Sequence, residues 1–516
     1  MSDKNVTLLI SGNRMVVDPT TTAIRELLEP ALSYTARRFL YGKDRRRAGG
    51  RKVELTDYHC YTFDVKLRLA TSLGFYDRVR DILESSGYTV QTVNCSPPED
   101  PSIFVPMWER LADPDSGITL RPGQDEFLAR LFSRIAAGLP GRFDCPPGYG
   151  KSFLIAVAAL LLPRARIHVA SDRVPVLRDR IYPELCGMLP SVGIVGGGRR
   201  VTGCRVMCYT FDSLHHSRGD ADILFVDECH EAAADTAAAR LAVYDHSLNY
   251  GFSATHDMRL DNKDMRLEAM FGPVVYRIPY SRAQEDGLVV PIEVFWSDVI
   301  MDLNPCGGLS DDIERKRAGI WRNQYRNEVI AANARADQKA GRQQLITCET
   351  IEHVLALKKL LPDFEVVYAE NGITPHDRRY FERQGLWPPG HEPMTAERRA
   401  NLTAAFERGV LREAIVTTVW NVGVSFNRLQ VLNRADAGGS PIMDTQIPGR
   451  VSRPSPDDPE SKPVGIVRDY CDQFDSGFRA KAASRRRNYE AHGWTQHLPS
   501  RGYTTGRDSA YSPREV

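Results

Sequence analysis

The sequence predicts an α/β protein with two parallel-sheet domains in tandem and a small α/β module in front of them. Short, uniformly apolar runs alternate with helical stretches twice along the chain, over residues 115–290 and again over residues 291–475. Apolar strands separated by helices are typical of a parallel sheet that is covered on both faces. A length of 516 residues also leaves room for about three or four domains.

The N-terminal accessory module is predicted over residues 1–108. Short strands are expected at Val6–Ile10 and Val53–Leu55, and an amphipathic helix at Phe75–Ser85. Three prolines within residues 96–101 exclude a helix or a central strand and therefore indicate a linker.

The first parallel-sheet domain is predicted over residues 109–290, with helices at Ser152–Leu162 and Val174–Met188. Its predicted strands are Arg142–Cys145, Ile167–Ala170, Val192–Val195, Arg205–Tyr209, Ile223–Val226 and Tyr250–Ser253.

The second parallel-sheet domain is predicted over residues 291–475, with an inserted loop at 381–395. The basic tail, residues 476–516, is predicted as a helix followed by disorder, since its end is rich in Ser, Gly and Tyr. Arg485–Arg487 are expected at a solvated helix end, with nucleic-acid contact as the alternative. The predicted strands are Glu293–Trp296, Gln344–Thr347, Glu365–Tyr368, Ala414–Thr417, Gln430–Leu432 and Gly465–Val467.

A nucleotide phosphate site is predicted in the sequence CPPGYGKS, which begins at Cys145. Two glycines let the backbone curl so that its N–H groups face phosphates. The lysine is expected to reach the β- and γ-phosphates of ATP, and the serine hydroxyl to ligate Mg²⁺. A short Gly-Lys-Ser sequence also occurs by chance, but here it stands between a strand and a helix, as a P-loop requires. The predicted nucleotide contacts are Gly148, Tyr149, Gly150, Lys151 and Ser152.

An acidic pair follows the apolar run Ile223–Val226. Asp227 and Glu228 are therefore expected at the C-terminal edge of a parallel strand, where ligands of α/β sheets bind. Two acids after a strand are common. The P-loop upstream is what makes this pair a candidate for metal binding and catalysis. In that context we expect Asp227 to hold Mg²⁺ and Glu228 to deprotonate the attacking water.

Two arginines lie far downstream in the sequence QIPGRVSR. Gln446, Arg450 and Arg453 are spaced at i, i+4 and i+7, which places them on one face of a helix. In isolation, this spacing favours a solvated face. Together with a P-loop and an acidic pair, it indicates side chains that stabilise charge on the transferred phosphoryl group.

The ordered motifs resemble those of superfamily 2 helicases over residues 115–475. The resemblance implies two RecA-like domains and an ATP hydrolase in which Lys151 and Glu228 act with the Gln446–Arg453 segment. It places Gln124, in LRPGQDEFL, at the adenine-contacting position. The residues that it implies for coupling to nucleic acid are His230, Ser253 and Thr255, and those for phosphate-backbone contact are Thr210 and Thr417.

A narrower resemblance is to the phage UvsW-type recombination helicases. The segment FGPVVYRIPYSRAQEDGLVVPIEV, from Phe271, is similar to the segment that joins the two RecA-like domains in that group. The stretch RRFLYGKDRRRAGGRKVELTDY, from Arg37, is similar to part of their small N-terminal domain. This resemblance implies action on DNA in recombination or repair.

A cluster of eight basic residues against one acid lies between Arg37 and Lys52, with Tyr34, Phe39 and Tyr41 interleaved. A solvated loop is one interpretation. Phosphate binding is favoured, because concentrated positive charge releases counterions from nucleic acid and aromatic rings offer stacking surfaces. The predicted contacts are Arg45, Arg46 and Arg47.

The composition restricts the remaining possibilities. A net charge of +1 means that any nucleic acid is held by local basic patches. There is no apolar run near 18 residues and no secretory signal, so we expect neither a membrane partner nor secretion. Ten cysteines without a CxxC pair are typical of reduced thiols in a cytoplasmic protein.

The sequence therefore predicts an ATP-dependent DNA helicase or branch-migration translocase that acts on single-stranded or branched DNA, with ATP and Mg²⁺. Within the same class, an RNA helicase or a duplex translocase that does not unwind stays open. The alternative of another class is a nucleic-acid-stimulated ATP switch that remodels protein complexes. Translocation polarity and oligomeric state, monomer or larger, stay open.

Overall fold

The computed structural model describes residues 4–39, 53–112, 117–146, 148–253, 262–370, 373–387, 392–417, 420, 426–455 and 459–499. By its internal contacts the chain forms two compact units. Unit 1 comprises Met1–Val290, Trp420–Asn427 and Ser440–Pro456, and unit 2 comprises Pro291–Val419, Arg428–Gly439 and Asp457–Val516. The predicted contacts Arg45, Arg46, Arg47 and Thr255 lie outside the described residues.

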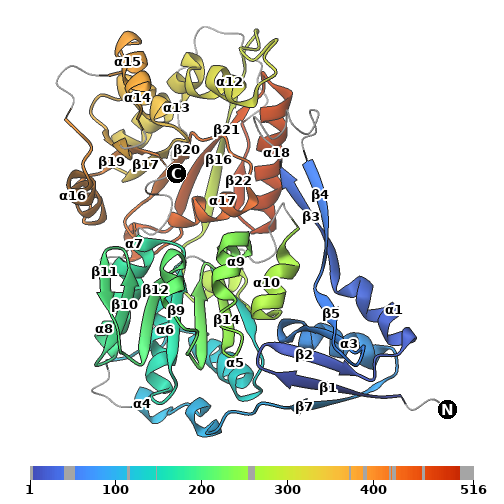
Figure 1. Cartoon of the computed structure of the whole chain (residues 1–516). Coiled ribbons are helices and arrows are strands. Elements are labelled where there is room, and N and C mark those ends of the chain that lie inside the picture. The colour runs from blue at the N-terminus through green and yellow to red at the C-terminus, as the bar shows by residue number, and fades with distance from the viewer. Residues whose placement is uncertain are drawn as a thin grey trace. The chain divides into compact units, whose positions relative to one another are not determined.

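Unit 1 begins with a five-stranded sheet in the order β5-β6-β2-β1-β7 (Figure 1). Residues along β1 alternate between buried and more exposed positions, and the buried ones pack against α1 and α3. A separate two-stranded hairpin consists of β3 and β4. The elements are β1 (Asn5–Ser11), β2 (Arg14–Asp18), α1 (Thr22–Ala31), β3 (Ser33–Phe39), β4 (Val53–His59), β5 (Tyr61–Phe63), β6 (Leu69–Ser72), α3 (Tyr76–Ser85) and β7 (Thr89–Asn94).

The large sheet of unit 1 has eight strands in the order β11-β10-β12-β9-β13-β14-β8-β15. All neighbouring strands are parallel except β11, which pairs antiparallel with β10. The strands are β8 (Gly141–Asp144), β9 (Ile167–Ser171), β10 (Val192–Gly196), β11 (Arg199–Val201), β12 (Val206–Thr210), β13 (Ile223–Asp227), β14 (Leu248–Ser253) and β15 (Val274–Arg277).

Successive residues of the central strands enter two different cores. Ile223 and Phe225 of β13 pack with α5 and α6, whereas Leu224 and Val226 pack with α9 and α10. The sheet is thus covered on both faces, as the uniformly apolar strands predict. The helices of unit 1 are α4 (Glu109–Ala112), α5 (Gln124–Ala136), α6 (Lys151–Leu161), α7 (Val174–Val176), α8 (Tyr182–Met188), α9 (Asp235–Leu241), α10 (Asp264–Phe271), α11 (Tyr280–Glu285) and α17 (Pro441–Gln446).

Unit 2 is built on a seven-stranded, fully parallel sheet in the order β18-β19-β17-β20-β21-β16-β22. The strands are β16 (Ile292–Val299), β17 (Gln344–Thr347), β18 (Glu365–Val367), β19 (Glu413–Val416), β20 (Val431–Arg434), β21 (Gly465–Asp472) and β22 (Thr495–His497). The helices are α12 (Asp312–Lys316), α13 (Gln324–Lys339), α14 (Ile351–Leu360), α15 (Pro375–Arg383), α16 (Ala396–Glu407) and α18 (Ser476–Ala491).

The predicted α/β class, with two parallel-sheet bodies and a small N-terminal sheet, is confirmed. Two details of the C-terminal region are wrong. Arg485 is buried rather than solvated, because its guanidinium forms two hydrogen bonds of 2.9 Å with the Asp469 carboxylate. The tail also adds a strand after its helix, since β22 pairs with β16 at the sheet edge.

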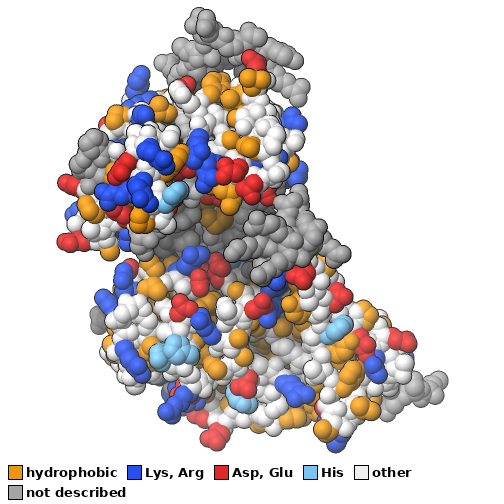
Figure 2. Space-filling model, turned by 45° about the horizontal axis from the view of Figure 1, so that its top comes forward, with side chains coloured by type: hydrophobic (Ala, Val, Ile, Leu, Met, Phe, Trp, Pro, Cys, Tyr) orange, Lys and Arg blue, Asp and Glu red, His pale blue; other side chains and the backbone are white. Residues whose placement is uncertain are grey.

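The surface carries charges of both signs. On the face shown in Figure 2, Lys and Arg side chains lie among Asp and Glu side chains, in keeping with a net charge of +1. No helix among the described residues combines the length and apolarity needed to cross a membrane. All ten cysteines are free thiols.

Candidate active site

The carboxyl ends of the central strands of unit 1 bring the predicted motifs to one edge of the sheet. Ser171, at the end of β9, pairs in register with Thr210 of β12 and Asp227 of β13. Ser253 of β14 pairs with Asp144, the last residue of β8, after which the P-loop begins. Ligands of parallel α/β sheets bind at this edge.

The P-loop curls between β8 and α6 as its glycines predict. Gly148 and Gly150 have φ angles of +90° and +98°, which side chains with a Cβ rarely adopt. A Cβ at Gly150 would also lie 2.9 Å from the Gln124 amide nitrogen. Helix α6 begins at Lys151, so its first backbone N–H groups face the loop. Such a helix start is a ready binding site for a phosphate.

Lys151 lies between the P-loop and the acidic pair. Its ammonium group is 3.5 Å from the Cys145 carbonyl oxygen and 3.9 Å from a Glu228 carboxylate oxygen. The lysine and the neighbouring Ser152 are both buried. The ammonium group is thus held at the start of α6, where the backbone also favours anions.

Asp227 has the features of a metal ligand. Burial, with the charge of Glu228, raises the pKa of its carboxyl group to about 6, and Lys151 opposes the shift. Its Oδ1 atom is buried and accepts no hydrogen bond from the described residues. A buried, unsatisfied carboxylate oxygen is costly unless a cation binds it. The other predicted donor is the hydroxyl of Ser152 in the first turn of α6, and both are hard oxygens, which suit Mg²⁺. Among the described residues, no group of three or more His, Cys, Asp or Glu side chains is arranged to hold a metal ion, so protein ligands alone do not complete a site here.

Glu228 occupies a strained backbone position. Its φ and ψ angles of 49° and 48° lie in the left-handed region, which is rare for a residue other than glycine, asparagine or aspartate. Its side chain is 21% exposed, in contrast to the buried Asp227 beside it. The two acids therefore differ in environment, as a metal ligand and a proton acceptor should.

His230 connects three motifs. Its Nδ1 atom is 2.8 Å from the Ser253 hydroxyl and 3.4 Å from a Glu228 carboxylate oxygen. Its Nε2 atom is 3.5 Å from the Gln446 amide nitrogen. The imidazole is buried, and its role in coupling stays a prediction.

The arginine segment belongs to unit 1 by its contacts. The Arg453 side chain passes over the P-loop, where a Cβ at Gly148 would lie 3.4 Å from its Cγ. The Val290 N–H donates to the Ser452 carbonyl at 2.7 Å and anchors the segment. The predicted single helix is wrong, because α17 ends at Gln446 and a 3₁₀ turn follows over Pro448–Arg450. A proline inside a helix removes a hydrogen bond and clashes with the preceding turn.

Positive charge is crowded around this segment. Burial lowers the pKa of Arg450 to about 10. Burial, together with the charges of Arg180 and Arg450, lowers the pKa of Arg453 to about 9. Guanidinium groups gathered in this way are suited to bind phosphate.

Arg180 is a site residue that the sequence analysis missed. Its positive charge lowers the pKa of both Asp227 and Arg453, so it lies within electrostatic reach of these two side chains. It belongs to a π-helical turn, Leu177–Ile181, between α7 and α8. Such turns are frequent at functional sites, but the turn is not visible in the residue pattern.

Gln124 is buried at the start of α5 and holds the P-loop. Its amide nitrogen donates to the Tyr149 carbonyl at 2.8 Å, and its carbonyl oxygen accepts from the Arg121 N–H at 2.9 Å. Both ends of the amide are therefore occupied by protein groups.

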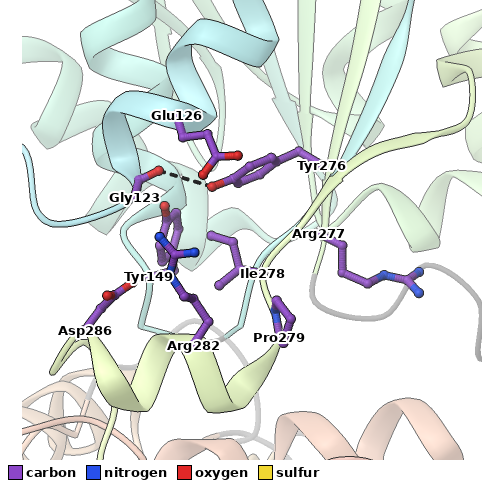
Figure 3. Close-up of a pocket in the computed structure, with 9 residues that line it drawn as sticks. All are labelled: Gly123, Glu126, Tyr149, Tyr276, Arg277, Ile278, Pro279, Arg282 and Asp286. Carbon is purple, nitrogen blue, oxygen red and sulfur yellow. Dashed lines mark hydrogen bonds and ion pairs between the residues drawn. The ribbon is translucent and has the colours of Figure 1, made fainter.

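A cavity of about 110 Å³ is lined by Gly123, which precedes Gln124 in the chain, and by Tyr149 of the P-loop (Figure 3). The Tyr276 hydroxyl donates to the Gly123 carbonyl at 3.2 Å within its wall. Arg282 is tethered to Asp286 at 3.3 Å, whereas Arg277 points away from the cavity. Aromatic, apolar and hydrogen-bonding groups thus converge beside the P-loop.

The predicted phosphate-backbone contacts are both buried. The Thr210 hydroxyl accepts from the Ser213 N–H at 3.2 Å and caps the 3₁₀ helix that follows it. Thr417, in unit 2, is buried after β19, and its N–H donates to the Val367 carbonyl at 3.2 Å. Their contact with nucleic acid stays a prediction.

No protein-family model matches the sequence, and no curated protein sequence matches it either. Solved structures do match it. T4 UvsW is 14% identical, with a TM-score of 0.38 over 96% of this chain and 99% of that chain. The helicase Lhr of Mycobacterium smegmatis, bound to single-stranded DNA and AMP-PNP, is 16% identical with a TM-score of 0.48. Dbp5 of S. cerevisiae, bound to RNA and ADP BeF3, is 11% identical with a TM-score of 0.49.

The three matches differ in extent. This chain is covered to 78% in the match to Lhr, which involves 52% of that chain, and to 73% in the match to Dbp5, which involves 90% of that chain.

Proposed function

We propose that this chain is an ATP-dependent DNA helicase or translocase that couples ATP hydrolysis to unwinding or branch migration in recombination or repair. One observation carries the proposal. The P-loop, the acidic pair and the segment Gln446–Arg453 meet at one sheet edge, although the chain on both sides of that segment belongs to unit 2. The state of the nucleotide can therefore act on chain that is continuous with the second sheet, as a motor requires.

The site residues suit phosphoryl transfer to water. Glu228 would take a proton from the attacking water as its oxygen bonds to the γ-phosphorus and the bond to the β-phosphate oxygen breaks. Lys151 would neutralise the β- and γ-phosphates. Arg450 and Arg453 would stabilise the charge that develops on the transferred group.

We propose Ser152 and Asp227 as the residues that hold Mg²⁺. When bound, Mg²⁺ neutralises charge on the phosphate oxygens. The buried Oδ1 atom of Asp227 supports this assignment.

We propose that the base of ATP enters the cavity beside Gln124. The Gln124 amide is occupied by the P-loop and by Arg121, so its role here is to position Tyr149. The cavity offers the aromatic ring of Tyr276 and the carboxylate of Glu126 to a base. Stacking and hydrogen bonding would then hold the adenine.

The β3–β4 hairpin supports a nucleic-acid contact at the N-terminal module. Arg37 and Arg38 are exposed on β3, and the basic cluster continues beyond them. On the same hairpin, Tyr34 stacks on Tyr58 with ring centroids 5.2 Å apart. Cations beside aromatic rings are the groups that bind single-stranded or branched nucleic acid.

ATPase assays of the full chain test the proposal. Turnover is measured without nucleic acid and with single-stranded DNA, duplex DNA, branched DNA or RNA, and strand separation is followed with labelled duplexes. We expect DNA to stimulate turnover, with the largest effect from branched or single-stranded DNA. Stimulation by RNA alone would indicate an RNA helicase, and stimulation without strand separation a translocase or a protein-remodelling switch. An ATPase that no nucleic acid stimulates would contradict the proposal.

Neutralising Arg45, Arg46 and Arg47 to alanine is expected to weaken DNA binding. Each lost phosphate contact should reduce the slope of log affinity against log salt by about 0.7–0.9. The loss should be greatest for branched DNA, while turnover at saturating DNA persists, since the residues that bind ATP lie elsewhere. The measurement is a titration of labelled DNA at several salt concentrations. An unchanged affinity and slope would identify a solvated loop.

We also propose a cytoplasmic location, in a bacterial or phage-infected cell. Ten free thiols support it, because such thiols persist in reducing compartments.

A further inference from the structure

Helix α10 is held on one side by the N-terminal sheet. The Arg78 guanidinium, on α3, forms two hydrogen bonds of 2.8 and 2.5 Å with the Glu268 carboxylate. The Ser72 hydroxyl donates to the Ala269 carbonyl. At Gly74, a Cβ would collide with the backbone carbonyl of Glu268. The N-terminal module therefore contacts both a side chain and the backbone of α10.

The contact between the N-terminal module and α10 also includes an apolar core. Met265 and Ala269 of α10 pack against the core of the N-terminal sheet, and Leu139 lies within it. A second bidentate pair joins Asp77 of α3 to Arg134 of α5, with distances of 3.1 and 2.8 Å. The module cannot leave α10 without exposing apolar surface and breaking charged hydrogen bonds.

The opposite side of α10 supports the segment that carries His230. Leu267 and Phe271 share a core with Cys229 in the 3₁₀ helix Cys229–Ala233. The Arg266 guanidinium donates to the Ala233 carbonyl at 3.1 Å and pairs with Asp235. His230 lies in this 3₁₀ helix, 2.8 Å from the Ser253 hydroxyl.

We infer that Arg78 is a positioning residue for the stimulation of ATP hydrolysis by nucleic acid, because it connects the N-terminal module to the helix that supports the active site. The path is Arg78 to Glu268, along one turn of α10, and from Leu267 and Phe271 to the segment of His230. A ligand changes a distant site only if it favours one arrangement of the elements between them. Here those elements are the short helix α10 and the contacts that attach it to the N-terminal sheet, among which is the Arg78–Glu268 pair.

The inference rests on the proposed function, since it requires a nucleic acid at the N-terminal module. The inference also goes beyond the proposed function, because it assigns a role to the attachment between the N-terminal module and α10. Basic residues that only bound DNA would need no fixed attachment to α10, and a flexible linker would serve them equally well.

Three variants of the full chain test the inference. Arg78→Ala removes the charged pair, and the double variant Arg78→Glu with Glu268→Arg restores it with reversed charges. Arg80→Ala is the matched control, because Arg80 lies on the same helix and pairs with Glu84 on the surface. ATPase kcat and KM are measured without DNA and with saturating branched DNA, and DNA affinity is measured separately.

In Arg78→Ala, the stimulation of kcat by DNA should fall by about 2- to 30-fold, the range for residues along a coupling network. Turnover without DNA, the KM for ATP and DNA affinity should change little. The double variant should regain part of the stimulation, and Arg80→Ala should match the unaltered chain.

Full stimulation in Arg78→Ala, with DNA stimulating the unaltered chain, would overturn the inference alone. Equal losses of basal and stimulated turnover that the double variant does not relieve would show a purely structural role and overturn it as well. If no nucleic acid stimulates the unaltered chain, the proposed function and the inference fail together.

Discussion

Replacement of Glu228 by glutamine is expected to abolish ATP turnover while ATP binding persists. The amide has nearly the same shape and can follow the same backbone path, but it cannot take a proton from water. Loss of a general base typically lowers the rate by about 10²–10⁴-fold. Turnover is measured by phosphate release, and binding with a fluorescent ATP analogue.

Two further variants distinguish loss of the general base from loss of ATP binding and from an unspecific effect of substitution. Lys151→Ala should lose turnover and also weaken binding, because the ammonium group would contact the β- and γ-phosphates. Glu99→Gln, in the exposed linker, should leave both unchanged. Near-normal turnover in Glu228→Gln would show that another group activates the water.

Replacement of Arg450 or Arg453 by alanine should reduce hydrolysis by roughly 10³-fold or more if these side chains stabilise the transferred phosphoryl group. ATP binding should change little, because their effect is greatest when charge develops on that group. Single-turnover measurements at saturating ATP distinguish a slower chemical step from weaker binding.

The lysine variant is the control for charge. Arg453→Lys keeps the positive charge but loses the planar fork that meets a phosphate at two points, so it should recover only part of the rate. Full activity in both alanine variants would mean that the arginines serve packing alone, and the motor proposal would lose its main support.

The order of strands and helices could largely be predicted from the sequence, because the signals are local. A short strand, a Pro/Gly loop and an apolar helix in succession predict the P-loop, and the structure begins α6 at Lys151, within one residue of the prediction. The acidic pair was likewise identified from the strand before it, and Asp227 ends β13.

The features that the sequence analysis missed depend on partners distant in the chain or on local backbone detail. Arg485 reads as a surface residue within a run of arginines, and only the packing of α18 on β21 reveals its pair with Asp469. Arg180 comes near Asp227 through a π-helical turn that leaves no pattern in the residues. At Gln446–Arg453 the side-chain spacing suggested a helix, and Pro448 in the same segment was the signal against it.

The assignment of Ser440–Pro456 to unit 1 has a consequence for how the chain folds during synthesis. Domains generally fold as units, N-terminal first, as they leave the ribosome. Here the contacts of unit 1 are incomplete when Val290 emerges, because Ser452 and Arg453 are made only after most of unit 2. A nascent chain, or one truncated after Val290, therefore has a P-loop that lacks its contact with Arg453. Full assembly of the nucleotide site must wait for residues that are translated late.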